Sequence, residues 1–161
     1  MNLSELIKSL ELGGGILLPV DFPVKGISCN SRKTGADFVF VAIKGVKTDG
    51  NKFIEEAVLN GARAVILKSA GKGTRIKEKN KVVFIEVDED RKALTQLACA
   101  FYGNPSAKMK VIGVTGTNGK TTITYLIESI LKECGFVAGV IGTINYRFRD
   151  KIISSQNTTP G

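Results

Sequence analysis

A glycine-rich turn between an apolar run and an amphipathic run constrains this chain more than any other feature. Residues 111–122 read VIGVTGTNGKTT, which predicts a buried strand over Val111–Val114, a tight turn and then a helix. This order points backbone N–H groups and a helix N-terminus at one spot, which suits a chain of phosphates. The segment is therefore expected to form a nucleoside-triphosphate site.

Within this segment, Lys120 and Thr121 carry the expected chemistry. The Lys120 ammonium can neutralise charge on the outer phosphates, and the Thr121 hydroxyl is placed to bind Mg²⁺. The general phosphate-loop pattern has a glycine six residues before the lysine, where Val114 stands in this chain. The alternative is a glycine-rich turn that only packs, but the strand before the Gly-Lys-Thr core and the amphipathic helix after it favour a phosphate site.

Composition excludes several other classes of protein. The chain has 161 residues, 43% hydrophobic residues, a net charge of +8, no histidine and three widely separated cysteines. Histidine-based catalytic triads and histidine zinc sites are therefore excluded, and the cysteines lack metal-ligand spacing. The basic residues are dispersed, so we expect no nucleic-acid partner. No apolar run is long enough for membrane insertion, and the absence of a targeting signal favours a cytoplasmic protein.

The first two thirds of the chain alternate between strand and helix patterns. Residues 1–10 have the apolar spacing of an amphipathic helix. Strands are expected at 37–43, 62–67 and 81–87, helices at 51–59 and 90–102, and an exposed loop or short helix at 69–80. Asp49 is the expected cap of the first of these later helices. Strands separated by helices predict an α/β fold with parallel strand pairing.

A turn at Gly103–Ser106 separates the two expected domains, 1–106 and 107–161. The second domain continues with a helix at 121–134, a strand at 137–141 and a hairpin with strands at 145–148 and 151–154. This is too short for a nucleotide domain that covers both faces of its sheet. We therefore expect the N-terminal part of a longer enzyme, with exposed apolar surface in the second domain. The alternative is a small complete protein with an abbreviated sheet.

Several motifs in order along the chain resemble the Mur ligase family. The segment Thr115–Thr122 resembles the ATP loop of these enzymes, including the Val-Thr start that replaces the usual first glycine. Cys29–Arg32, Asp37–Gly45 and Asp49–Ile54 resemble the uridine-binding first domain of the MurE and MurF types. Asn157–Pro160 resembles the MurE type in particular. The departures are Asn30, where aspartate is commoner, and Gly161, where an acidic residue often follows the proline.

The resemblance implies a small uridine-binding α/β domain followed by the start of a phosphate-loop mononucleotide-binding α/β domain. It also implies an ATP-dependent amide ligase of peptidoglycan synthesis, which uses Mg²⁺ and adds the third amino acid to UDP-N-acetylmuramoyl-L-alanyl-D-glutamate through an acyl phosphate. Diaminopimelate and lysine are the usual third amino acids. The ATP phosphates would be held by Gly116, Thr117, Asn118, Gly119, Lys120, Thr121 and Thr122, with Lys120 as the catalytic residue and Thr121 as the metal ligand. Ser31 and Arg32 would contact the uridine nucleotide, and Asn157, Thr158 and Thr159 would bind the UDP-sugar.

Other interpretations of the same residues stay open at this point. Ser31 and Arg32 could be a helix cap and a solvated charge, and the threonines near the end could bond their own backbone. A MurF-type ligase, which adds a dipeptide, or a non-catalytic nucleotide-binding module would also carry the phosphate loop. The family's modified lysine, its central-domain acidic metal ligand and its amino-acid-selecting domain are not in this sequence, so we expect that the 161-residue chain alone cannot complete the ligation.

Overall fold

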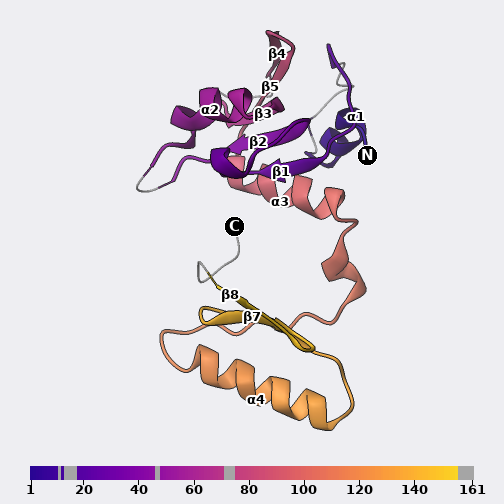
Figure 1. The fold of residues 1–161 in the computed structure, drawn as a ribbon, viewed down its shortest axis with the longest axis vertical. Coiled ribbons are helices and arrows are strands. Elements are labelled where there is room, and N and C mark those ends of the chain that lie inside the picture. The colour runs from indigo at the N-terminus through magenta and orange to yellow at the C-terminus, as the bar shows by residue number, and fades with distance from the viewer. Residues whose placement is uncertain (11, 13–17, 46–47, 71–74, 156–161) are drawn as a thin grey trace. The chain divides into compact units, whose positions relative to one another are not determined.

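The chain forms two compact units, Met1–Met109 and Lys110–Gly161. The computed structural model describes residues 1–10, 12, 18–45, 48–70 and 75–155 (Figure 1). The boundary between the units falls after Met109, which directly follows the short 3₁₀ helix η4 (Pro105–Lys108). Pro105 stands in the first turn of η4, where its missing N–H costs nothing.

The first unit is built on a five-stranded sheet with the order β1-β2-β3-β5-β4. Its strands are β1 (Gly26–Ser28), β2 (Phe38–Ala42), β3 (Ala62–Lys68), β4 (Arg75–Lys79) and β5 (Val82–Val87). Strands β1, β2, β3 and β5 run parallel to their neighbours, and β4 pairs antiparallel with β5. The predicted α/β class with parallel pairing is therefore confirmed.

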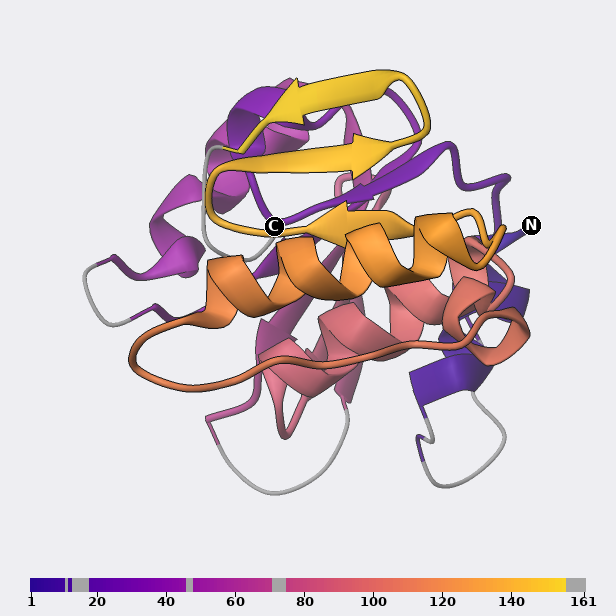
Figure 2. The ribbon, with the colours of Figure 1, turned by 90° about the horizontal axis from the view of Figure 1, so that it is seen from below.

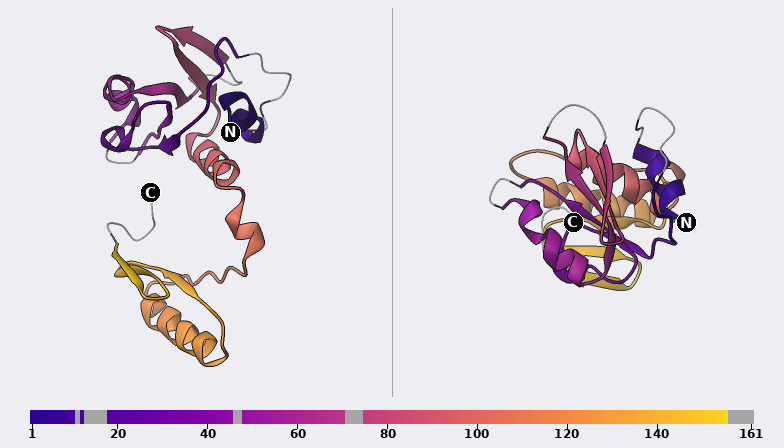
Figure 3. Two further views of the ribbon diagram at one scale, coloured as in Figure 1. Left: turned by 45° about the vertical axis from the view of Figure 1, so that its right-hand side comes forward. Right: turned by 90° about the horizontal axis from the view of Figure 1, so that it is seen from above.

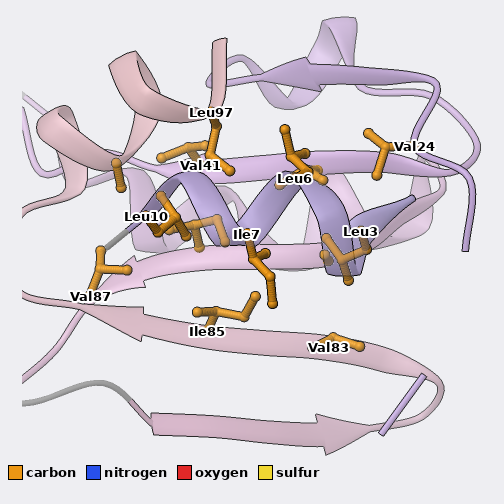
Figure 4. Packing of buried hydrophobic residues seen from close by; sticks show 14 of the residues in the cluster. Leu3, Leu6, Ile7, Leu10, Val24, Val41, Val83, Ile85, Val87 and Leu97 are labelled. Carbon is orange, nitrogen blue, oxygen red and sulfur yellow. The ribbon is translucent and has the colours of Figure 1, made fainter. Parts of the chain in front are cut away.

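Helices cover both faces of this sheet. On one face, α1 (Leu3–Ile7), η1 (Lys8–Leu10) and α3 (Asp90–Phe101) share a core with the central strands (Figure 4). The apolar side chains expected from the spacing of residues 1–10 are all buried there: Leu3, Leu6, Ile7 and Leu10. On the other face, η3 (Gly50–Phe53) and α2 (Ile54–Leu59) lie over a smaller cluster around Phe40, Ala57 and Val65.

The segment 69–80, expected as an exposed loop or short helix, contains strand β4 instead, so that prediction is wrong. Figure 3 shows the resulting β4–β5 hairpin at the edge of the sheet. Asn80 and Lys81 connect its strands, and both have positive φ angles, of 54° and 64°. Two consecutive positive φ angles are typical of the tightest hairpin turns. The charged residues of β4 suit an edge strand, because they discourage pairing with a further chain.

The second unit pairs one helix with a three-stranded antiparallel sheet, as Figure 2 shows. The helix is α4 (Lys120–Glu133), and the strands are β6 (Gly139–Ile141), β7 (Asn145–Phe148) and β8 (Lys151–Ser154). The predicted hairpin is confirmed with its predicted bounds, and Arg149 in its turn has a φ of 53°. The helix ends before Gly135, whose φ of 78° suits a glycine after a helix.

The predicted strand at Val111–Val114 is wrong, because these residues form no strand in the structure. A strand needs a neighbour to satisfy its backbone, and β6 pairs only with β7 among the described residues. Val111 and Ile112 are 69% and 60% exposed. The unit exposes other large apolar side chains as well, which matches the expectation of exposed apolar surface there: Leu126, Ile130, Phe136, Val137, Ile141, Ile144, Ile152 and Ile153.

Candidate functional site

Two glycines shape the turn that leads into α4. Gly119 is the residue before the helix and has a φ of 77°, and Gly116 has a φ of 148°. Side-chain-bearing residues rarely adopt these angles, so both positions favour glycine. The Gly119 carbonyl accepts a hydrogen bond from the Ile123 N–H at 2.9 Å, which begins the helical ladder. The sequence prediction of a glycine turn followed by a helix is therefore confirmed at this end of the loop.

Lys120 folds back over the turn that precedes it. Its ammonium Nζ donates to the Gly116 carbonyl and, at 3.2 Å, to the Thr117 carbonyl. These contacts hold a positive charge against the loop at the start of α4, where the helix dipole also favours an anion. Thr121 is half-buried, and its carbonyl accepts from the Thr124 hydroxyl at 2.7 Å. The remaining loop residues Thr117, Asn118 and Thr122 are exposed.

A pocket of about 200 Å³ adjoins Lys120 and Thr121. One wall comes from the loop and from α4, and the other comes from β6, β7 and the turn between them. The lining residues are Val114, Lys120, Thr121, Thr124, Tyr125, Val140, Ile141, Gly142, Thr143, Ile144, Asn145 and Arg147. Hydroxyl, amide and cationic groups on an aliphatic floor can bind a polar ligand beside bound phosphates.

The far wall of this pocket is fixed by Arg147. Its guanidinium makes a two-pronged ion pair with Glu128 of α4 and lies 3.8 Å from the centre of the Tyr125 ring. Its third nitrogen donates to the Asn145 amide oxygen at 3.2 Å. The hydrogen bonds that Arg147 donates to Glu128 raise the pKa of Arg147 further above its ordinary value. This group was not predicted from the sequence, although Tyr125 and Glu128 are three residues apart on one helix face, a spacing that indicates a shared partner.

The structure places the other predicted site residues at the end of β1 in the first unit. Asn30 caps the 3₁₀ helix η2 (Ser31–Lys33) by accepting the Arg32 N–H at 3.0 Å. Ser31 is buried; its hydroxyl donates to Glu56 at 2.7 Å, and its carbonyl accepts from the Asn60 amide at 2.9 Å. Arg32 is exposed. The predicted residues Asn157, Thr158 and Thr159 lie outside the described residues.

Thr121 is the only protein ligand to Mg²⁺ that the sequence analysis identified. Within the described part of the chain, no group of three or more His, Cys, Asp and Glu side chains could hold a metal ion. A hydroxyl with few other protein ligands still fits Mg²⁺, because this ion keeps several waters and takes phosphate oxygens as ligands. In the same described part, no helix is long and apolar enough to span a membrane.

Comparisons with known proteins identify the family. Residues 23–102 match the model of the Mur ligase family catalytic domain, and residues 114–161 match the model of the Mur ligase middle domain. The second match includes the phosphate loop and α4, and the first includes Ser31 and the sheet of the first unit. The chain belongs to the Mur ligase family.

Two curated relatives carry the same name. A ligase from Clostridium tetani named UDP-N-acetylmuramoyl-L-alanyl-D-glutamate–2,6-diaminopimelate ligase is 42% identical over 99% of this chain and 32% of its own length. A protein of the same name from Aquifex aeolicus is 48% identical over 85% of this chain and 27% of its own length. The chain thus spans about a third of the length of the relatives it matches.

Solved structures agree on the fold. A MurF ligase from Thermotoga maritima in complex with ADP is 35% identical, with a TM-score of 0.51 over 68% of this chain and 24% of that protein. A UDP-N-acetylmuramoyl-L-alanyl-D-glutamate–2,6-diaminopimelate ligase covers 95% of this chain and 30% of its own, with a TM-score of 0.68 and 24% identity. At that identity, the second match supports the fold alone.

Proposed function

We propose that this chain is part of a MurE-type ligase, which uses ATP to join an amino acid to UDP-N-acetylmuramoyl-L-alanyl-D-glutamate. The observation that carries the proposal is the phosphate loop at the start of α4, within a chain that matches Mur ligase domains in order. The relatives' names favour diaminopimelate over lysine as the amino acid added. The ADP in the Thermotoga maritima relative favours ATP as the energy source.

The reaction has two steps. The γ-phosphoryl group of ATP passes to the glutamate carboxylate; the bond to the β-phosphate oxygen breaks, and ADP leaves. The amine of the amino acid then attacks the acyl carbon, loses a proton and displaces inorganic phosphate, so that one amide bond forms. Phosphoryl transfer of this kind depends mainly on positioning and charge neutralisation.

Lys120 is the residue of the described chain that best fits this requirement. Its ammonium lies at the loop beside the Gly116 and Thr117 carbonyls, within reach of phosphates bound at the start of α4. The loop residues 116–122 would hold the ATP phosphates through their N–H groups. Thr121 would contribute a hydroxyl to Mg²⁺, and the bound ion would neutralise phosphate charge. The adjoining pocket would receive the carboxylate end of the acceptor, next to the γ-phosphate.

The first unit would bind the uridine end of the acceptor. Ser31 and Arg32 lie at the carboxyl end of a parallel strand, which is where open α/β sheets bind ligands. Asn157, Thr158 and Thr159 would hold the sugar part of the same substrate. A cytoplasmic location would give the enzyme access to ATP and to a soluble UDP-sugar. We include no nucleic-acid partner in this proposal.

A MurF-type activity is the second candidate. The match to the Thermotoga maritima MurF structure favours it, because the identity there is 35%. The identities of 42% and 48% to relatives named as diaminopimelate ligases favour the first candidate. The two activities differ in the acceptor, since the MurF type extends a tripeptide rather than a dipeptide.

Nucleotide binding by Lys120→Met tests the phosphate loop. Calorimetric titration with Mg-ATP should give a Kd that rises by at least about tenfold in this variant, because a charge-assisted contact to phosphate is lost. Lys132→Met is the matched control: it removes a lysine from the last turn of the same helix, far from the loop. Equal affinities of the two variants would contradict the assigned role of Lys120. If both variants lost their affinity for Mg-ATP, the cause would be damage to the fold rather than loss of the Lys120 charge.

A further inference from the structure

Two backbone hydrogen bonds join residues just after β2 to residues 48–50, at the carboxyl edge of the first sheet. The Ile43 carbonyl accepts from the Gly50 N–H at 2.9 Å, and the Thr48 carbonyl accepts from the Gly45 N–H at 2.9 Å. Gly50 leaves no room for a side chain, since an added Cβ would lie 2.6 Å from the Ile43 nitrogen. Residues 43–45 and 48–50 are therefore held close together.

A buried carboxylate braces the same segment from the other side. Asp90, at the start of α3, is 7% exposed. One of its oxygens accepts the Lys44 N–H at 2.8 Å, across 46 positions of sequence, and the other accepts the Arg91 N–H at 2.7 Å. Burying a carboxylate is costly unless it is hydrogen-bonded, and here both oxygens are satisfied by backbone N–H groups. This contact fixes the backbone of Lys44.

Lys44 is itself exposed, and it forms no ion pair with any other described residue. Arg32, at the end of the neighbouring parallel strand β1, is also exposed and likewise makes no ion pair in the described ranges. Glu56 accepts from the Ser31 hydroxyl and Asp90 accepts from backbone N–H groups, and neither carboxylate forms an ion pair with Lys44 or Arg32. Lys44 and Arg32 are therefore exposed cations near the carboxyl ends of β2 and β1, outside the ion pairs of the described ranges.

We propose that Lys44 binds the diphosphate of the nucleoside diphosphate part of the substrate, and that Asp90 is the positioning residue that holds Lys44 in place. This inference rests on the proposed function and extends it by a specific phosphate contact in the first unit. The carboxyl edge of a parallel sheet is the usual ligand edge of such folds, and a diphosphate needs cations there. A lysine with a braced backbone loses less conformational freedom on binding than one on a mobile loop.

Titration with a series of uridine compounds tests the role of Lys44. The chain and its Lys44→Gln variant are titrated calorimetrically with UDP, UMP and uridine at one ionic strength. We expect the variant to weaken UDP binding by about tenfold, UMP binding by less and uridine binding not at all, because only the phosphates meet the ammonium. Lys52→Gln is the matched control, since Lys52 is exposed in η3, just after the same segment. It should leave all three affinities unchanged.

ADP serves as a second arm, because its diphosphate is the same group on a different base. Lys44→Gln should leave ADP binding at the phosphate loop unchanged, and Lys120→Met should weaken it. If UDP binds equally well to wild type and Lys44→Gln, the inference is overturned while the proposed function stands. If the wild-type chain, shown to be folded, binds none of the uridine compounds, both the uridine site and this inference are overturned.

A double-mutant cycle separates positioning by Asp90 from general stabilisation. Asp90→Asn places an amide where the carboxylate accepts from Lys44, and it should weaken UDP binding by several-fold. In the double variant with Lys44→Gln, the Asp90→Asn change should add little further loss, because its effect acts through Lys44. Losses that simply multiply would overturn the positioning role. Since Lys44→Gln retains the backbone N–H that Asp90 bonds, it tests the diphosphate contact even if Asp90→Asn fails to fold.

Discussion

Glu128 and Arg147 join the phosphate-loop helix α4 to strand β7 through a two-pronged ion pair, with side chains that are 27% and 12% exposed. The pair is partly shielded from water, so removing one partner leaves the other with an imperfectly compensated charge. Since the same guanidinium lies over Tyr125, it also fixes the wall of the pocket beside Lys120.

We predict that Arg147→Gln lowers the free energy of unfolding of the second unit by about 1–3 kcal/mol. Arg149→Gln, in the exposed turn between β7 and β8, is the matched control and should change it by less than about 0.5 kcal/mol. Denaturant unfolding monitored by tyrosine fluorescence measures both, since Tyr125 lies against Arg147. Equal stability of the two variants would show that the ion pair contributes nothing.

The two units should respond differently to truncation of a leucine. Leu97 on α3 is fully buried, at 0% exposure, so Leu97→Ala should destabilise the first unit by about 2–5 kcal/mol. Leu126 on α4 is 59% exposed, and Leu126→Ala should cost less than about 1 kcal/mol. Thermal and denaturant unfolding of the two variants compare the costs directly. A larger cost for Leu126→Ala would mean that the α4 face is covered in solution.

The stability of the first unit should depend on pH through Asp21. The backbone N–H of Ser4 donates to this carboxylate at 3.0 Å and lowers its pKa below the ordinary value of 3.8; the Ser4 hydroxyl, the Phe22 N–H and the Asn2 amide add to the effect. A carboxylate whose folded pKa is depressed stabilises the fold above its unfolded pKa. That stabilisation is lost as the pH falls through the lower folded value.

Asp21→Asn should therefore be less stable than wild type at pH 6, and the difference should shrink as the pH is lowered below 3.8. Melting temperatures measured from pH 2.5 to 6 give this comparison. Asp150→Asn, at an exposed position between β7 and β8, is the control. If the melting temperatures of Asp21→Asn and wild type differed by the same amount at every pH, the lost stability would come from packing rather than from the Asp21 charge.

Gly119→Ala should impair the phosphate loop without altering the core. The added methyl group would meet only the end of the Ile123 side chain, at 4.0 Å, so space is not the obstacle. The obstacle is the backbone, because an alanine with a φ of 77° costs about 1 kcal/mol or more. We expect weaker Mg-ATP binding with little change in the unfolding of the first unit. Unchanged ATP affinity in Gly119→Ala would contradict a phosphate site at this turn.

Much of the first unit follows from local patterns. The parallel strands, the buried face of residues 1–10 and the cap at Asp49 all come from apolar spacing and turn chemistry. Strand β4 does not follow from its local pattern, because its charged residues are typical of a loop. Only its pairing with β5 makes it a strand. Conversely, Val111–Val114 has a strand's composition, but among the described residues it has no neighbour to pair with.

The candidate site divides in the same way. The phosphate-loop residues are contiguous in sequence, so their motif and their glycines identify them. Asp90 meets Lys44 across 46 positions, and Glu128 meets Arg147 across 19, so each contact depends on strand order that the sequence does not state. Ser31 was predicted from a resemblance, and its bond to Glu56 was not predicted at all.

The most direct test of the account is calorimetric titration of this chain with UDP-N-acetylmuramoyl-L-alanyl-D-glutamate, with and without Mg-ATP. We predict saturable binding that UDP competes away, that GDP does not, and that weakens in Ser31→Ala. Glu56→Gln, which keeps the serine hydroxyl, should weaken binding less. A folded chain that fails to bind this compound, or from which excess GDP displaces it as readily as excess UDP does, would contradict the proposal of a Mur-type substrate site.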